Sequence, residues 1–218
     1  STETVPGFHG VFSKDAGKQI IHSRKTAGKL VHQSTLVHSY PFCPRTDTPL
    51  IYRAIEAWYV RVEDLHDRLA ANNDTVHWVP AALGEKRFGN WLREARDWNI
   101  SRKRYYGLPL PFYPCECGHL TVIGSKAELR ERAVDPAKVD ALPELHRPWV
   151  DDVEIVCPAC GRHVCRIREV GDVWLDAGIV PFSTLGYFSD REKWEKYWPA
   201  DWITEMREQI RLWFYSML

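Results

Sequence analysis

Four cysteines in two close pairs are the residues of this sequence whose spacing points most directly to chemistry. One residue separates Cys115 from Cys117, two residues separate Cys157 from Cys160, and a glycine follows each pair. Glycine relieves backbone crowding at such a turn and lets amide groups approach the sulfur atoms. Four thiolates make a closed tetrahedral Zn²⁺ site that stabilises a small unit without catalysing a reaction. The spacing therefore predicts a structural zinc site; the alternative is reduced thiols without a metal.

Two further cysteines do not fit this pattern. Thr46 stands where a C-x-x-C pair beginning at Cys43 would need its second ligand, so we expect no second zinc site there. Cys165 falls in an alternating run, which favours a half-buried thiol on a strand, although it could also replace a zinc ligand. The first ten residues lack a signal peptide, and no apolar run reaches the roughly 20 residues that span a bilayer. We therefore expect a cytoplasmic protein that contacts no membrane and has no disulfides.

Helices are predicted where apolar residues recur every three or four positions. The ranges are 15–25, 63–72, 86–98 and 204–218. Two more helices are indicated by a serine followed three residues later by a glutamate, which is the signature of a capping box. These signatures begin at Ser125 and Ser189, and the second helix must end before Pro199. On periodicity alone, Trp213 in the last range is a core residue.

Strands are predicted at three places. Residues 50–62 alternate and are rich in tyrosine, isoleucine, tryptophan and valine, which favours a strand. Residues 108–113 contain two prolines and must form an edge strand or one bounded by loops. Residues 153–156 and 164–167 look like the two arms of a small hairpin around the second cysteine pair. The elements therefore indicate a mixed chain of helices and strands.

Composition limits the class of protein. With 44% hydrophobic residues, the 218-residue chain can bury a core and form one or two domains. Basic and acidic residues number 29 each, so the net charge is zero. Any contact with RNA must therefore come from a local basic patch rather than from the charge of the whole chain.

Four ordered blocks resemble the catalytic body of the class I aminoacyl-tRNA synthetases, in the isoleucyl form. They are His38-Ser-Tyr-Pro-Phe-Cys43, Asn90-Trp-Leu-Arg-Glu-Ala-Arg-Asp-Trp-Asn-Ile-Ser-Arg102, Asp172-Val-Trp-Leu-Asp-Ala-Gly178 and Pro199-Ala-Asp-Trp-Ile-Thr-Glu205, the last continuing to Phe214. Asn99 stands where the valyl form typically has cysteine. The alternatives are a fragment of a valyl- or leucyl-tRNA synthetase, or a stand-alone zinc-ribbon module that binds RNA or protein.

The resemblance implies an α/β fold that is part of a class I Rossmann-type catalytic core. Residues 1–40 would be the tail of the editing domain, and residues 41–113 would lead back into the core. Residues 114–170 would form an inserted zinc ribbon, and residues 171–218 a core segment with the aminoacyl-adenylate site. No catalytic residue is assigned within these ranges.

The resemblance also implies roles for five residues. Trp174 and Trp213 match the tryptophans that wall the isoleucine side chain. Glu205, Glu208 and Gln209 match the residues that hold the aminoacyl-adenylate, where a carboxylate suits the substrate ammonium group and an amide suits a carbonyl or ribose. Without the resemblance, the three polar residues would be assigned to a solvated helix face.

Three positions depart from the family pattern. Met206 and Leu212 stand where the family usually has glycine, and Glu208 stands where it usually has aspartate. A bulky Met206 would crowd a close backbone approach, so the local geometry is expected to differ. After the second block, the basic and aromatic run 102–106 could contact the acceptor end of tRNA or simply form a charged turn.

The implied activity is that of an isoleucine–tRNA ligase. Such an enzyme uses ATP and Mg²⁺ to form isoleucyl-adenylate and transfers isoleucine to tRNA(Ile). The expected partners are therefore tRNA(Ile), isoleucine and ATP, and the expected state is a monomer. The His-Ile-Gly-His and Lys-Met-Ser-Lys-Ser signatures that clamp ATP do not occur in these 218 residues. We therefore expect an internal fragment that is inactive by itself.

Overall fold

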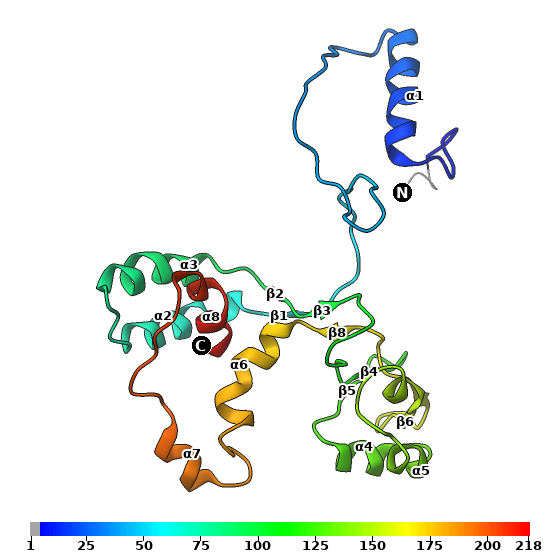
Figure 1. Ribbon diagram of the computed structural model, residues 1–218. Helices are drawn as coiled ribbons and strands as arrows, with labels where there is room; N and C mark the ends of the chain where they lie inside the picture. Colours follow the sequence, from blue (N-terminus) through cyan, green and yellow to red (C-terminus); the bar gives the residue numbers. More distant parts are fainter. Residues whose placement is uncertain (1–4) are drawn as a thin grey trace. The chain divides into compact units, whose positions relative to one another are not determined.

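The computed structural model describes residues 5–218 and divides the chain into two units, Ser1–Ala54 and Ile55–Leu218 (Figure 1). In the first unit, helix α1 (Ser13–Thr26) confirms the helix predicted at 15–25. A long stretch without regular structure follows it and ends in a small loop closed by a bridge between Phe42 and Pro49. Residues 1–4 of the predicted segment 1–40 lie outside the described residues.

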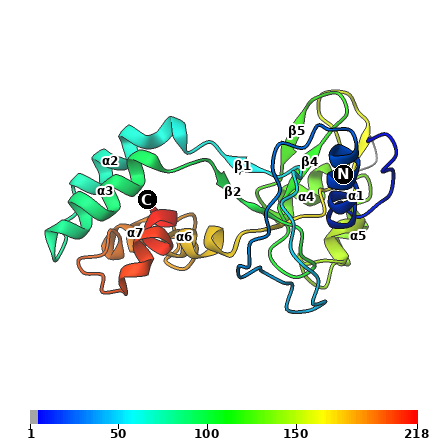
Figure 2. The same ribbon diagram turned by 90° about the horizontal axis from the view of Figure 1, so that it is seen from above.

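The second unit opens with a helical pair. The elements are β1 (Tyr59–Val60), η1 (Glu63–Leu65), α2 (His66–Asp74), the π-helical turn η2 (Leu83–Phe88), α3 (Gly89–Glu94) and β2 (Trp98–Asn99). Helices α2 and α3 lie side by side (Figure 2). Their apolar faces meet in a core that includes Leu69, Phe88, Leu92 and, from the end of the chain, Ile210. The predicted helical periodicities therefore correspond to one buried face.

A second core lies in the middle of the chain. The elements are β3 (Ser101–Arg102), β4 (Phe112–Pro114), β5 (Leu120–Val122), α4 (Lys126–Arg132), α5 (Pro136–Asp140), η3 (Trp149–Asp152), β6 (Ile155–Val156), β7 (His163–Val164) and β8 (Val170–Gly171). Tyr113, Val139, Val153 and Ile155 are fully buried in this core. We call residues 112–165 around it the cysteine module, because both cysteine pairs lie in its turns.

The chain ends in four helical segments. These are α6 (Val173–Ser183), α7 (Arg191–Tyr197), η4 (Arg207–Arg211) and the short α8 (Trp213–Met217). Helices α6 and α8 pack closely at Gly178, where an added Cβ would lie 2.5 Å from the carbonyl oxygen of Ser216. Glycine is therefore required at this crossing. In residues 5–218 no helix has the length and apolar character needed to cross a bilayer.

Every strand pair in residues 5–218 is antiparallel and two-stranded: β1–β2, β3–β8, β4–β5 and β6–β7. The pairing of Ile155 with Val164 and of Val156 with His163 confirms the predicted hairpin. The fold is thus a mixture of helices and short strands. These residues by themselves do not show the parallel sheet of a Rossmann-type core.

Three predicted elements are shorter than expected. Of the strand predicted at 108–113, only Phe112 and Tyr113 lie in a strand, β4. In the predicted strand 50–62, only Tyr59–Val60 is a strand, because strand formation needs a partner and only these two residues pair, with Trp98 and Asn99. The helix predicted at 86–98 ends at Glu94, where Ala95 turns into extended backbone (ψ 128°). Pairing with β1 therefore overrides helical periodicity at Trp98.

Two helix boundaries also differ. Asp190, not Ser189, caps α7, since its carboxylate accepts the backbone N–H of Lys193 (3.0 Å). The helix predicted at 204–218 is interrupted at Leu212 (φ −120°, ψ −105°), which separates η4 from α8. The capping box at Ser125 is confirmed, because the Ser125 hydroxyl accepts the Glu128 N–H (3.1 Å).

Candidate functional site

The four cysteine thiols converge on one point. The Sγ atoms of Cys115 and Cys160 are 3.5 Å apart, those of Cys117 and Cys157 are 3.8 Å apart, and all four lie within 4.8 Å of one another. A tetrahedral zinc site with Zn–S bonds of about 2.3 Å has sulfur atoms about 3.8 Å apart. The spacing of this cysteine quartet therefore fits a metal ion of that kind.

Two hairpin turns deliver the cysteine pairs. The first pair lies in the turn between β4 and β5, where the Cys115 N–H donates to the His119 carbonyl (2.8 Å). The second lies between β6 and β7, where the Cys157 N–H donates to the Arg162 carbonyl (2.8 Å). The glycine after each pair has a positive φ, +88° at Gly118 and +73° at Gly161, which explains the residue type.

The thiols perturb one another electrostatically. The backbone N–H of Arg162 is the main cause that lowers the pKa of Cys160, to about 6. A backbone hydrogen bond from Cys117 lowers the pKa of Cys115, but burial and the neighbouring thiols outweigh it and raise this pKa to about 12. Thiolates this close repel one another, and a divalent cation would remove that repulsion.

The other two cysteines lie outside the quartet. Cys165 is exposed rather than half-buried, because it follows β7 instead of lying in it, and its thiol is 3.6 Å from a Glu154 carboxylate oxygen. Cys43 lies in the loop of the first unit, where its N–H donates to the carbonyl of Thr48 (2.9 Å). A hydrogen bond from the Thr46 side chain lowers the pKa of Cys43.

A buried arginine connects the cysteine module to the strand that follows it. The side chain of Arg166 is 1% exposed and donates to the carbonyls of Leu110 (3.0 Å) and Glu169 (2.9 Å) and to the Asp151 carboxylate. Burial raises the pKa of Asp151, but hydrogen bonds from Arg166 and Arg147 outweigh it, so this pKa lies below its ordinary value. The ion pair is thus well formed.

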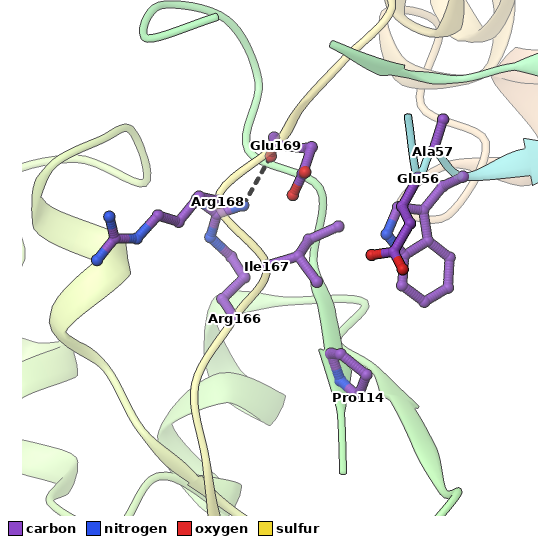
Figure 3. Close-up of a pocket in the computed structure, with 8 residues that line it drawn as sticks. Glu56, Ala57, Pro114, Arg166, Ile167, Arg168 and Glu169 are labelled. Carbon is purple, nitrogen blue, oxygen red and sulfur yellow. Dashed lines mark hydrogen bonds between the residues drawn. The ribbon is translucent and has the colours of Figure 1, made fainter. Parts of the chain in front are cut away.

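A surface hollow of about 660 Å³ lies beside Arg166 (Figure 3). The Ile167 side chain extends toward the segment that carries Glu56, whereas the Arg168 side chain points away from it. The residues that line the hollow are Glu56, Ala57, Trp58, Pro114, Arg166, Ile167, Arg168 and Glu169. None of the residues that the sequence assigns to a substrate is among them.

The two predicted wall tryptophans belong to the packed pair of helices α6 and α8. The indole Nε1–H of Trp213 donates to the carbonyl of Ala177 in α6 (2.8 Å). Trp174 lies three and four residues before Ala177 and Gly178, so all three share one face of α6. Both indoles are half-buried. The structure therefore brings Trp213 to the helix that carries Trp174.

The three polar residues predicted to hold the adenylate differ in their burial and contacts. The Gln209 amide oxygen accepts the backbone N–H of Trp213 (3.1 Å), so it caps α8 beside the indole. Glu205 and Glu208 are exposed. Met206 is 68% exposed, so its side chain is not crowded by the described residues of this chain.

One buried carboxylate was missed by the sequence reasoning. Asp172 is 6% exposed and accepts hydrogen bonds from the Trp98 indole (3.1 Å) and the Arg102 guanidinium. It also caps α6 through the backbone N–H of Trp174 (3.1 Å). An aspartate directly before a helix is a recognisable capping signal, but its two side-chain donors lie about 70 residues away and could not be read from spacing.

The basic and aromatic run is partly used inside the protein. Arg102 pairs with Asp172, and Tyr106 stacks on His146 with ring centroids 5.8 Å apart. The Arg147 guanidinium lies 5.1 Å from the ring of Tyr105. Residues 103–106 are nevertheless exposed, with Tyr106 at 79%. This leaves a surface of two basic and two aromatic side chains.

Known proteins similar to this chain belong to one family. The family described as "tRNA synthetases class I (I, L, M and V)" matches residues 11–218. The isoleucine–tRNA ligase of Methanopyrus kandleri is 41% identical over 100% of this chain, which spans 21% of that relative. The cytoplasmic isoleucine–tRNA ligase of Caenorhabditis elegans is 46% identical over 100% of this chain, which spans 19% of it. The chain thus spans about a fifth of the length of these curated relatives. It belongs to the class I tRNA synthetase family.

Proposed function

We propose that this chain is part of an isoleucine–tRNA ligase and contributes to its amino-acid pocket. The observation that carries the proposal is the identity of 41–46% to proteins of that name over essentially the whole chain. The valyl and leucyl alternatives lack this support among these relatives. A stand-alone zinc-ribbon module is not favoured either, because the family match extends far beyond the cysteine module.

The reaction has two steps. The carboxylate of isoleucine attacks the α-phosphate of ATP, which gives isoleucyl-adenylate and releases pyrophosphate. A ribose hydroxyl of the terminal tRNA adenosine then attacks the activated carbonyl, which gives isoleucyl-tRNA and releases AMP. Catalysis of this kind depends mainly on positioning and on stabilising developing charge. ATP and Mg²⁺ would be held mainly by the two signatures that these 218 residues do not contain.

In this proposal the helix pair α6–α8 forms the wall for the isoleucine side chain. Trp174 and Trp213 supply flat apolar surfaces, and the bond from Trp213 to Ala177 fixes the orientation of the second indole. Glu205, Glu208 and Gln209 would hold the aminoacyl-adenylate, since a carboxylate suits the substrate ammonium group and an amide suits a carbonyl or ribose. An apolar pocket separates isoleucine from valine by only about 1–3 kcal/mol. Such enzymes therefore need a separate editing site. Residues 1–40 would be the C-terminal tail of the domain that carries it.

The remaining segments take the roles that the resemblance implies. Residues 41–113 and 171–218 would join a Rossmann-type core built mainly by the rest of the protein, and residues 114–170 would be a zinc-ribbon insertion. Cys115, Cys117, Cys157 and Cys160 would hold a Zn²⁺ ion. When bound, the metal supplies a cross-link between two hairpin turns and no chemistry in the reaction.

We further propose that the exposed run 103–106 contacts tRNA(Ile). Lys103 and Arg104 can bind phosphates, and exposed tyrosines can stack on unpaired bases. The wider protein would act in the cytoplasm, in keeping with relatives that are named cytoplasmic. We also propose that it acts as a monomer.

The test is ATP–pyrophosphate exchange by the full-length protein with isoleucine, valine and leucine in parallel. We expect kcat/KM for isoleucine to exceed that for valine by about 100-fold, which is typical when one methylene is distinguished. A preference for valine or leucine would replace the isoleucine assignment. Absence of exchange with all three, in a folded protein, would refute the proposed function.

A further inference from the structure

We propose that Asp172 is a positioning residue for the amino-acid pocket: it fixes the start of α6 and, through α6, both tryptophan walls. The inference rests on the proposed function, because it concerns the same pocket. Asp172 does not touch the substrate in this scheme. It acts on Trp174 through a direct hydrogen bond, and on Trp213 through helix α6, to which the Trp213 indole is hydrogen-bonded.

Both carboxylate oxygens of Asp172 are used. Oδ1 accepts the backbone N–H of Trp174 (3.1 Å), which caps α6. Oδ2 accepts the indole N–H of Trp98 (3.1 Å) and the guanidinium of Arg102. The backbone N–H of Asp172 donates to the Ile100 carbonyl (2.8 Å). With only 6% of its surface exposed, Asp172 is held from three directions.

The groups that hold Asp172 are themselves fixed. Arg102 also donates to the carbonyls of Asn99 (2.8 Å) and Ser101 (2.9 Å), so its guanidinium has a defined place. Strand β3, which carries Arg102, pairs with β8, which ends one residue before Asp172. The start of α6 is therefore attached to a strand pair rather than to a single flexible side chain.

The position of α6 determines both walls. Trp174 lies in the first turn of α6, two residues after Asp172. One turn further on, the Ala177 carbonyl accepts the Trp213 indole, and Gly178 packs against the backbone of Ser216. A shift at the start of α6 would therefore move both indoles. Misplacement by about 1 Å is enough to reduce activity on the order of 100-fold.

The chemistry of the site requires aspartate. The three groups that meet the carboxylate are all N–H donors, from the Trp174 backbone, the Trp98 indole and the Arg102 guanidinium. A carboxylate offers only acceptors, whereas an asparagine amide has an NH₂ group that would oppose one of these donors. Asparagine is nevertheless as good a helix cap as aspartate. Asp172→Asn therefore preserves the cap and disrupts the link to Trp98 and Arg102.

The experiment compares Asp172→Asn with Asp190→Asn in the full-length enzyme by pyrophosphate exchange. Asp190 caps α7 through the Lys193 N–H, and within residues 5–218 no arginine or indole hydrogen-bonds to its side chain. For Asp172→Asn we expect the isoleucine KM to rise on the order of tenfold, the ATP KM to stay within about twofold, and the isoleucine-to-valine preference to fall. Asp190→Asn should leave all three near wild type.

Trp98→Phe is a milder second variant, because it removes the indole donor but keeps an aromatic ring. It should raise the isoleucine KM in the same direction, by a smaller factor. Hydrogen exchange of α6 peptides supplies a readout that does not depend on activity. Exchange in residues 173–183 should be faster in Asp172→Asn than in wild type and unchanged in the cysteine module.

The outcomes separate the inference from the proposed function. If folded Asp172→Asn keeps the wild-type isoleucine KM and α6 exchange, the positioning role is overturned while isoleucine activation stands. Equal rises in the KM values for isoleucine and ATP would also overturn it, because they indicate general destabilisation. A wild-type enzyme that does not activate isoleucine refutes the proposed function, and unchanged α6 exchange would then refute the positioning role separately.

Discussion

Four thiols within 4.8 Å of one another could hold a cation. The nearby Arg162 is engaged with Glu116 (2.8 Å), and one guanidinium cannot balance several thiolates. A tetrahedral metal ion can do so, and its binding energy adds directly to folding. At the scale of single residues, a metal ion bound by the cysteine quartet would cross-link the turns of β4–β5 and β6–β7.

This account predicts the metal content of the purified chain. Protein prepared without chelator should contain about one zinc per chain, because the quartet offers one closed site. The double substitution Cys157→Ser and Cys160→Ser should abolish binding and lower the melting temperature. Cys165→Ser is the matched control, since Cys165 lies outside the quartet, and it should retain the metal. Elemental analysis decides, and zinc retained by the double variant would contradict the assignment.

Trp213 is the residue on which the pocket assignment can be tested most directly. In the full-length enzyme, Trp213→Ala removes one wall; large-to-small changes cost roughly 3–5 kcal/mol in a packed site and less in a pocket open to water. We expect the isoleucine KM to rise on the order of 100-fold, since each 1.4 kcal/mol is about tenfold. The ATP KM should change much less, and larger amino acids should be accepted more readily.

The control for this substitution is Trp149→Ala, because Trp149 lies in η3 of the cysteine module, outside the segment 171–218 that carries the proposed pocket. It should leave both KM values close to wild type. If Trp213 were only a core residue, Trp213→Ala would lower the melting temperature while the constants for isoleucine and ATP changed together. Steady-state kinetics with each substrate varied in turn, beside a melting curve, distinguishes the two roles.

At the scale of elements, the close contact between α6 and α8 depends on Gly178, which has no side chain. A Cβ at Gly178 would lie 2.5 Å from the Ser216 oxygen, so Gly178→Ala must separate the two helices. We expect a loss of about 1–3 kcal/mol of stability, the usual effect of overpacking. The Trp213–Ala177 hydrogen bond should weaken as well, which should raise the isoleucine KM.

Gly17→Ala is the matched control, because a Cβ at Gly17 in α1 meets nothing within 4 Å. It should be neutral or slightly stabilising, since alanine favours helix over glycine. Chemical denaturation of both variants measures the difference. Equal stability of the two variants would mean that the α6–α8 contact tolerates a side chain.

The sequence predicted those elements well whose structure depends on residues close together in the chain, such as turns and helix caps. The cysteine quartet follows from spacing and glycine turns, and the cap at Ser125 from its own side chain. Pairing between distant segments could not be predicted. Trp98 leaves its helical pattern because it pairs with Val60, and Asp172 becomes a centre of hydrogen bonds only when β3 meets β8. The resemblance therefore pointed to Trp174 and Trp213 as candidate pocket residues, but the hydrogen bonds of Asp172 could not be predicted.

At the scale of the whole molecule, the chain spans about a fifth of the length of its curated relatives. Large apolar side chains are exposed on strand β1 and on helix α6, among them Tyr59, Val173 and Ile179. Exposed apolar surface of this extent is typical of faces that contact other protein segments. A Rossmann-type core would be completed by such segments.

The last prediction concerns the activity of the 218-residue chain by itself. Activation of isoleucine needs ATP held in line with the substrate carboxylate, and neither ATP-clamping signature occurs in this sequence. The exposed Glu205 and the half-buried Trp174 and Trp213 can supply only one side of a pocket. We therefore expect no isoleucine-dependent pyrophosphate exchange from the chain, even at enzyme concentrations at which the full-length protein reacts rapidly. Zinc content and a cooperative melting curve show that the chain is folded. Measurable exchange from the folded chain would mean that it binds ATP through residues other than the two family signatures.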